Sequence, residues 1–130
     1  MVAKRILYVE DSNEKYMAVS MSMKSMGFKA PVRKTNLSEA IDEIVGAKES
    51  GEAFDVVITD MNYPLAPGEP ENEGSGEILI DRLQEKGIDV PVIVISSFNY
   101  NVEKAFRSIW FVKSRNWEDD LERAIQEAIQ

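Results

Sequence analysis

The run Asp55-Val56-Val57-Ile58-Thr59-Asp60 decides the fold, because a short, continuous stretch of mainly β-branched residues stands between two carboxylates. A run that is apolar throughout, instead of alternating with polar residues, is typical of a strand buried on both faces of a parallel sheet. Residues 6–9, 92–95 and 109–112 have the same character. Residues 30–33 are more polar and contain a proline, which favours an edge strand. The sequence therefore predicts five strands.

Segments with helical spacing of apolar residues lie between these runs. The clearest are residues 37–45, with Asn36 as the expected N-cap, and residues 121–129, after the candidate cap Asn116. Two further helices are predicted, with less regular patterns: residues 13–26, ended by Gly27, and residues 78–86, ended by Gly87. Strands that alternate with helices indicate a parallel sheet with right-handed crossovers and helices on both faces.

Length and composition limit the possible functions. The 130 residues fit one domain, 1–130, and the net charge of -8 disfavours binding to nucleic acid or to anionic membranes. The chain contains no cysteine and no histidine, which excludes disulfides, imidazole bases and the usual zinc ligands. The first apolar run has only four residues, too few for a signal peptide or a membrane span, so we expect a cytoplasmic protein.

Polar side chains stand where the predicted strands end. Glu10 and Asp11 follow the first strand, Asp60 the third, Ser96 the fourth, and Lys113 the fifth. The carboxyl ends of parallel strands share one edge, where such folds place their ligand sites. Clustered carboxylates repel one another, and a divalent cation that prefers oxygen ligands, such as Mg²⁺, relieves that repulsion.

This set of groups suits phosphoryl transfer. A carboxylate is a nucleophile toward phosphorus, the metal neutralises the developing charge, and a lysine and a hydroxyl bind the remaining oxygens. Each group alone also has a simpler interpretation: an acidic residue after a strand is often a helix cap, and a lysine is usually a surface charge. Their joint placement at four strand ends favours the functional interpretation.

Four segments, taken together, resemble the receiver domain of two-component response regulators. The resemblance extends from about Lys4 to Ile129 and lies in Arg5-Ile6-Leu7-Tyr8-Val9-Glu10-Asp11-Ser12, Asp55-Val56-Val57-Ile58-Thr59-Asp60-Met61-Asn62-Tyr63-Pro64, Pro91-Val92-Ile93-Val94-Ile95-Ser96-Ser97 and Trp110-Phe111-Val112-Lys113. The resemblance implies a flavodoxin-like α/β fold, a doubly wound five-stranded parallel sheet of order 2-1-3-4-5 with helices on both faces.

The resemblance also implies a metal site and a phosphoacceptor. Glu10 and Asp11 would hold Mg²⁺ directly or through water, together with Asp60 and the backbone carbonyl of Asn62. Asp60 would accept a phosphoryl group from a phosphohistidine on a sensor histidine kinase or a phosphotransfer protein. The side chain of Asn62 would lie near the route of a hydrolytic water.

Three more residues would form the switch implied by the resemblance. Ser96 would move inward to bond the phosphoryl group, and Lys113 would form a salt bridge to it. Trp110 matches the aromatic position whose rotamer reports phosphorylation; the alternative is a partly buried core aromatic. With no output module in the 130 residues, the signal would leave through a downstream effector protein.

The sequence departs from the family pattern in three places. Ser114 replaces the proline that normally follows the lysine through a cis bond, and a cis bond to a non-proline costs roughly 3 kcal/mol. Only 17 positions separate Ser96 from Lys113, so the helix between the last two strands should be short or absent. Residues 65–76, next to the phosphoacceptor, form a longer loop than usual, which is either a gate for the site or a plain surface insertion.

The sequence thus predicts a phosphorylated switch and not an enzyme, beyond self-phosphotransfer and slow autodephosphorylation. The alternative is a phosphorylation-independent pseudo-receiver that acts as a protein-interaction module, which the missing proline and the shortened helix favour. A phosphohydrolase is disfavoured, because an acid or base two residues after the nucleophile is needed to activate water and position 62 is Asn.

Overall fold

The computed structural model describes residues 4–130, and its centre is a five-stranded parallel sheet. The strand order is β2-β1-β3-β6-β7, with neighbouring strands parallel throughout, as the sequence predicts. The strands are β1 Ile6–Val9, β2 Val32–Lys34, β3 Val56–Thr59, β6 Val92–Ser96 and β7 Arg107–Trp110. The three central strands are completely buried, which explains why their sequences are almost entirely apolar, with polar residues only at the carboxyl ends of β3 and β6.

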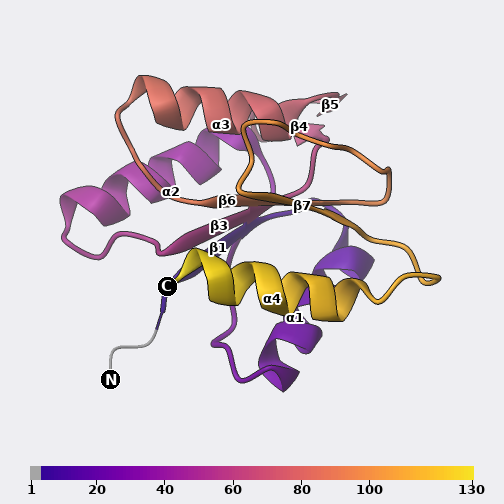
Figure 1. The fold of residues 1–130 in the computed structure, drawn as a ribbon. Coiled ribbons are helices and arrows are strands. Elements are labelled where there is room, and N and C mark those ends of the chain that lie inside the picture. The colour runs from indigo at the N-terminus through magenta and orange to yellow at the C-terminus, as the bar shows by residue number, and fades with distance from the viewer. Residues whose placement is uncertain (1–3) are drawn as a thin grey trace.

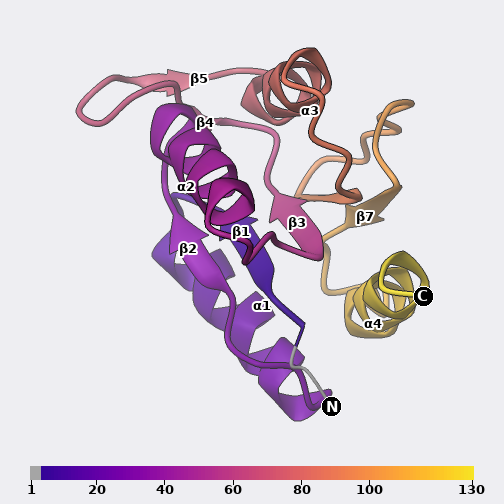
Figure 2. The ribbon, with the colours of Figure 1, turned by 90° about the vertical axis from the view of Figure 1, so that its left-hand side faces the viewer.

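Two helices cover each face of the sheet (Figure 1). Helices α2 and α3 lie on one face and α1 and α4 on the other, and the view in Figure 2 shows the sheet between the two layers. Their bounds are α1 Asn13–Ser25, α2 Leu37–Glu49, α3 Ser75–Glu85 and α4 Trp117–Ala128. Each face of the sheet has its own apolar core cluster, so the fold has three layers. Among residues 4–130, no helix is long and apolar enough to cross a membrane.

Local signals in the sequence set the helix starts. The side chain of Asn36 accepts a hydrogen bond from the backbone N–H of Glu39 at 3.0 Å, and the Asn36 amide donates to the Glu39 carboxylate, so the expected N-cap is confirmed. Ser12 caps α1 in the same way, through a bond from the backbone N–H of Lys15. Helix α3 begins at Ser75, three residues earlier than its apolar pattern predicts.

The last strand differs most from its prediction. The apolar run predicts a strand over 109–112, whereas β7 spans Arg107–Trp110 and pairs Ser96 with Trp110. The prediction was wrong by two residues because β7 is an edge strand with partly exposed side chains, which tolerates Arg107 and Ser108 in place of apolar residues. Lys113 therefore lies three residues past the end of the strand.

The connection between β6 and β7 contains no helix in residues 97–106, which confirms the expectation of a short or absent helix. The side chains of Tyr100, Val102 and Ala105 pack instead against the core cluster under α2 and α3. Figure 1 shows this segment as the orange chain that loops above β7, on the side of the sheet that carries α3.

Residues 65–76, which the sequence predicts as a loop, include part of a hairpin. Strands β4 Tyr63–Pro64 and β5 Glu71–Asn72 pair antiparallel, and α3 follows directly. Ser75 fixes this hairpin, because its hydroxyl donates to the carbonyl of Tyr63 at 2.6 Å and is itself fully buried. The insertion is thus a structured element next to Asp60.

Candidate metal and phosphoacceptor site

The parallel pairing of β1 with β3 brings three carboxylates together. Val9 pairs with Thr59, so the residues that follow, Glu10 and Asp60, emerge side by side at the same edge. The backbone N–H of Asp60 donates to the carbonyl of Val9 at 3.0 Å, which fixes this junction. Glu10, Asp11 and Asp60 each offer a carboxylate oxygen, and these oxygens lie within 4.8 Å of one another. The structure therefore brings together the three acidic residues that the sequence singles out.

Glu10 is the buried member of the cluster, with no exposed surface. One of its oxygens accepts hydrogen bonds from the hydroxyl of Tyr8 at 2.9 Å and the ammonium of Lys15 at 3.1 Å, and the other accepts from the backbone N–H of Ser12 at 3.2 Å. Burial raises the pKa of Glu10; the charge on Asp60 adds to that rise, and the charge on Lys15 opposes it. Protein donors already satisfy both oxygens, so Glu10 is the member least free to bind a metal directly.

Asp11 and Asp60 offer the freer oxygens. One oxygen of Asp60 accepts from the backbone N–H of Met61 at 2.8 Å and from Lys15 at 3.0 Å, whereas the other has no hydrogen-bond partner among residues 4–130. Asp11 is partly exposed, and its pKa is raised by burial and by the charge on Asp60, against the lowering effect of its own backbone hydrogen bond. The site thus holds more negative charge than its surroundings neutralise, and carboxylate oxygens at this spacing suit a hard divalent cation such as Mg²⁺.

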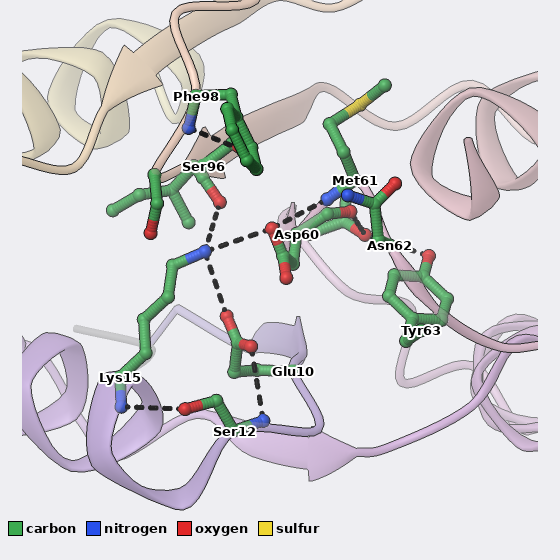
Figure 3. A network of polar contacts seen from close by, with 12 residues as sticks. Glu10, Ser12, Lys15, Asp60, Met61, Asn62, Tyr63, Ser96 and Phe98 are labelled. Carbon is green, nitrogen blue, oxygen red and sulfur yellow. Dashed lines mark hydrogen bonds and ion pairs between the residues drawn. The ribbon is translucent and has the colours of Figure 1, made fainter. Parts of the chain in front are cut away.

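The ammonium in the site belongs to Lys15, which the sequence analysis did not single out. Its three partners are Asp60, Glu10 and the backbone carbonyl of Ile95, the last at 2.7 Å, and they match the three donors of an ammonium group. Figure 3 shows the Lys15 nitrogen between the carboxylates of Glu10 and Asp60. Only 8% of the side chain is exposed. A lysine is rarely buried to this degree unless it has anionic partners, as Lys15 has in Glu10 and Asp60.

A signal for Lys15 was present in the sequence. Lys15, Val19 and Met23 are spaced at i, i+4 and i+8, and these three form the buried stripe of α1. A lysine at the first position of an otherwise apolar stripe indicates that its long stem is buried and that its ammonium reaches a polar site at the end of the helix.

Ser96, the predicted phosphoryl ligand, lies in the same cavity and is buried. Its hydroxyl oxygen accepts a hydrogen bond from the backbone N–H of Phe98 at 3.2 Å, so its own proton remains available to a ligand in the cavity (Figure 3). Phe98 is 65% exposed and stands at the rim of the cavity, edge-on to Tyr100.

The structure does not bring Lys113 to this cavity. Lys113 is exposed, lies past the end of β7, and is not among the residues that line the cavity in the described part of the chain. Trp110, the predicted reporter of phosphorylation, is partly buried; its indole N–H donates to the carbonyl of Ser97 at 3.0 Å, and the Arg115 guanidinium lies over its ring. Phe111, the next residue, reaches the cavity instead.

The hairpin is attached to the segment that follows Asp60. The side-chain oxygen of Asn62 accepts a hydrogen bond from the backbone N–H of Gly74 at 2.9 Å, so this amide holds the hairpin. Gly76 packs against the same segment so closely that a Cβ atom there would lie 2.6 Å from the carbonyl oxygen of Asp60. The hairpin and the segment that follows Asp60 are therefore one packed unit.

The hairpin adds a further carboxylate to the rim. Glu71 lines the cavity, which has a volume of about 480 Å³, and burial together with the charges on Asp11 and Asp60 raises its pKa. The sequence analysis considered residues 65–76 only as a whole; which glutamate of this segment faces the site depends on the β4–β5 pairing. The complete lining is Glu10, Asp11, Ser12, Glu14, Lys15, Asp60, Asn62, Glu71, Ser96, Ser97, Phe98 and Phe111.

Comparison with known proteins gives a clear result for structure and none for sequence. No family model matches the sequence, and no curated protein matches it. The chain is similar in structure to the chemotaxis response regulator CheY4 of Vibrio cholerae, with a TM-score of 0.66 and 21% identity over 98% of this chain and 99% of that one. It is also similar to the signal receiver domain of a putative LuxO repressor protein from Vibrio parahaemolyticus, with a TM-score of 0.71 and 19% identity over 98% and 91% of the two chains.

A third similar structure is a DNA-binding response regulator of the LuxR family from Staphylococcus aureus, with a TM-score of 0.68 and 20% identity over 98% and 99% of the two chains. The matches extend over nearly the whole of both partners, including the sheet and the helices on both of its faces. The chain therefore has the fold of response regulator receiver domains.

Proposed function

We propose that this protein is a phosphoacceptor signalling switch of a two-component or phosphorelay system, with Asp60 as the residue that takes the phosphoryl group. The observation that carries the proposal is the convergence of Glu10, Asp11 and Asp60 at the end of β1 and β3, in an open cavity of a receiver fold. Asp60 is the central member, because its carboxylate lies within 4.8 Å of those of Glu10 and Asp11 and accepts a hydrogen bond from the ammonium of Lys15.

The carboxylates suit a bound Mg²⁺. Asp11 and Asp60 would hold the ion, with Glu10 acting directly or through water and the backbone carbonyl of Asn62 completing the protein ligands. When bound, the ion would neutralise the charge that develops on a transferring phosphoryl group. Burial raises the pKa of Asp11 most, and the nearby charge on Asp60 raises it further; this second contribution supports the assignment, because a cation would relieve the repulsion between the two carboxylates.

The unpartnered oxygen of Asp60 is suited to attack phosphorus. In the proposed step, this oxygen forms a bond to phosphorus as the bond from phosphorus to the nitrogen of a phosphohistidine breaks, and the electron pair of that bond stays on the imidazole. Ser96 would donate its free hydroxyl proton to a phosphoryl oxygen. The donor would be a sensor histidine kinase or a phosphotransfer protein, and a downstream effector protein would read the result.

A second function has a specific observation in its favour. Lys15 already pairs with both Asp60 and Glu10, so the site contains an ion-pair network without phosphate, and Glu71 at the rim adds negative charge that disfavours an incoming phosphate. A phosphorylation-independent pseudo-receiver, which acts only as a protein-interaction module, would use such a network to maintain the fold.

The two functions are separated by incubation with acetyl phosphate and Mg²⁺, followed by a phosphate-affinity gel. The switch predicts a shifted band in the wild type that is absent in Asp60→Asn and retained in Asp55→Asn, which changes an aspartate at the opposite end of β3. Absence of any Asp60-dependent product, with the protein folded and Mg²⁺ present, would reject the switch in favour of the interaction module. The same gel run over time measures autodephosphorylation.

A further inference from the structure

We infer that Lys15, on α1, binds the oxygens of the phosphoryl group on Asp60, the task that the family resemblance gives to Lys113. The inference rests on the proposed function, because it concerns the phosphorylated form of Asp60. It assigns the task to a residue on a different element of the fold, at the opposite end of the chain.

The contacts of Lys15 support this assignment. Its ammonium lies 3.0 Å from the Asp60 oxygen and 2.7 Å from the carbonyl of Ile95, the residue before Ser96. It therefore stands between the phosphoacceptor and the strand end that carries the predicted phosphoryl-binding hydroxyl. An ammonium in this position is within reach of a group that binds to Asp60 and contacts Ser96.

The charges explain why the ammonium would follow the phosphoryl group. Asp60 is a carboxylate before the reaction and an acyl phosphate after it, so its negative charge moves from the carboxylate onto the phosphoryl oxygens. The cation that pairs with Asp60 before the reaction is then nearest to the new charge. Charge-assisted bonds of this kind are stronger than neutral ones, and they are strongest where water is excluded, as around a side chain with 8% exposure.

The cavity offers no other cation for this task among the described residues. Of the side chains that line it, only that of Lys15 is positively charged, whereas five are carboxylates. Lys113 is exposed, and β7 ends three residues before it. The ring of Phe111 occupies the β7 side of the cavity, 5.6 Å from the Lys15 nitrogen.

The backbone of α1 holds Lys15 in position. Its N–H donates to the capping hydroxyl of Ser12, and Val19 and Met23, on the same stripe, are fully buried against the sheet. The ammonium is therefore placed by a capped helix and not by the loop after β7. This explains how the site tolerates Ser114, where the family has a proline that fixes its lysine.

The test compares Lys15→Met with Lys113→Met, the same chemical change at two positions. We expect Lys15→Met to lower the rate of phosphorylation by acetyl phosphate about 100-fold, the size of effect seen when one preorganised donor to a developing charge is removed. Lys113→Met should stay within about twofold of the wild type, since an exposed charge is screened by water. Loss of phosphorylation in Lys113→Met with normal rates in Lys15→Met would overturn the inference.

A second readout separates phosphoryl binding from a purely structural role. Lys15→Met removes a positive charge from beside the carboxylates, so Mg²⁺ alone, titrated by tryptophan fluorescence, should bind more tightly, whereas beryllium fluoride with Mg²⁺ should bind more weakly. A lysine that only stabilises the fold would weaken both. Opposite changes in the two affinities support the inference, and parallel losses overturn it.

Folding of the variant is controlled by removing the buried pair together. Lys15→Met leaves Glu10 buried without its cation, which can unfold a protein, whereas Glu10→Gln combined with Lys15→Met leaves no buried unpaired charge. Comparison of the double variant with Glu10→Gln alone gives the effect of Lys15 in a folded background. If the wild type takes up neither phosphate nor beryllium fluoride, the proposed function and the inference both fail. If the wild type is phosphorylated and Lys15→Met is phosphorylated at the same rate, only the inference fails.

Discussion

The two sides of the site differ in how strongly packing fixes their residues: the side formed by β1 and β3 is buried in the sheet, and the side formed by β6 and β7 lies at its edge. On the first side, two fully buried strands in parallel register place Glu10 and Asp60 next to each other, and a packed hairpin holds the segment after Asp60. On the second side, β7 is a partly exposed edge strand, and the chain that leads to it has no helix in residues 97–106. The difference teaches that a residue directly after a central strand has its position fixed by the register of the sheet, whereas a residue after an edge strand can be displaced from the site, as Lys113 is.

Truncation of one apolar side chain on each side should show the largest contrast. Ile58 on β3 is fully buried between the two layers, and we expect Ile58→Ala to lower the free energy of unfolding by about 3–5 kcal/mol. Ile109 on β7 is 7% exposed, and its loss should cost about 2 kcal/mol. Urea denaturation followed by circular dichroism measures both, and equal losses would show that the edge is as firmly packed as the centre.

The hairpin junction offers a second comparison, between two glycines. Gly76→Ala places a Cβ atom against the backbone of Asp60, and overpacking of this kind costs about 1–3 kcal/mol. Gly46 lies in α2 with open space around it, so Gly46→Ala should stabilise the protein by about 0.5–1 kcal/mol. Thermal unfolding shows whether each variant is less stable or more stable than the wild type. A neutral Gly76→Ala would mean that the hairpin moves easily relative to Asp60.

Mg²⁺ should stabilise the β1–β3 side of the site and reverse the pH dependence of the free energy of unfolding. The pKa of Asp11 is raised by burial and by the charge on Asp60, so the native state keeps a proton that the unfolded state loses. Without metal, the free energy of unfolding should therefore fall as the pH rises from about 4 through the raised pKa. At tenfold excess over its dissociation constant, Mg²⁺ at neutral pH should add about 1.4 kcal/mol.

Asp11→Asn tests this assignment. It should remove most of the stabilisation by Mg²⁺ and the part of the pH dependence that belongs to Asp11, whereas Asp89→Asn, at an exposed position outside the cavity, should keep both. Full stabilisation of Asp11→Asn by Mg²⁺ would place the ion elsewhere.

The smallest effect is expected on the β6–β7 side. Lys104 forms an ion pair at 2.7 Å with Asp81 on α3, and both side chains are about half exposed. Exposed pairs of this kind contribute little, because water and salt screen them. Lys104→Ala should leave the urea midpoint unchanged, and a clear loss would show that this pair holds the connection in place.

Most of the fold could be predicted from the sequence, because the central strands have a strong signal. Residues 6–9, 56–58 and 92–95 are buried on both faces and therefore apolar without interruption. The edge strand was misplaced because Arg107 and Ser108 face partly outward, so their polarity hides the start of β7. The paired strands β4 and β5 were missed, since two-residue strands carry no periodic signal.

The site was predictable only as far as the register of central strands determines it. Glu10, Asp11 and Asp60 follow directly from β1 and β3, and Ser96 from β6. The burial of Lys15 depends on how α1 packs at the end of the sheet, and the position of Glu71 depends on the hairpin. Neither follows from local propensity, although the i, i+4, i+8 stripe of α1 contains the signal for Lys15.

Because residues 97–106 form no helix, this segment should open locally at a lower free energy than the strands and helices around it. A helix would give most of its amides a partner four residues back, whereas in this segment only half of the ten backbone N–H groups have a hydrogen-bond partner in the described part of the chain, and none of these partners is four residues back. Amides without such bonds exchange with solvent through small local openings, at a free energy far below that of global unfolding. The rim that carries Phe98 can thus rearrange around a ligand while the five strands beneath it stay intact.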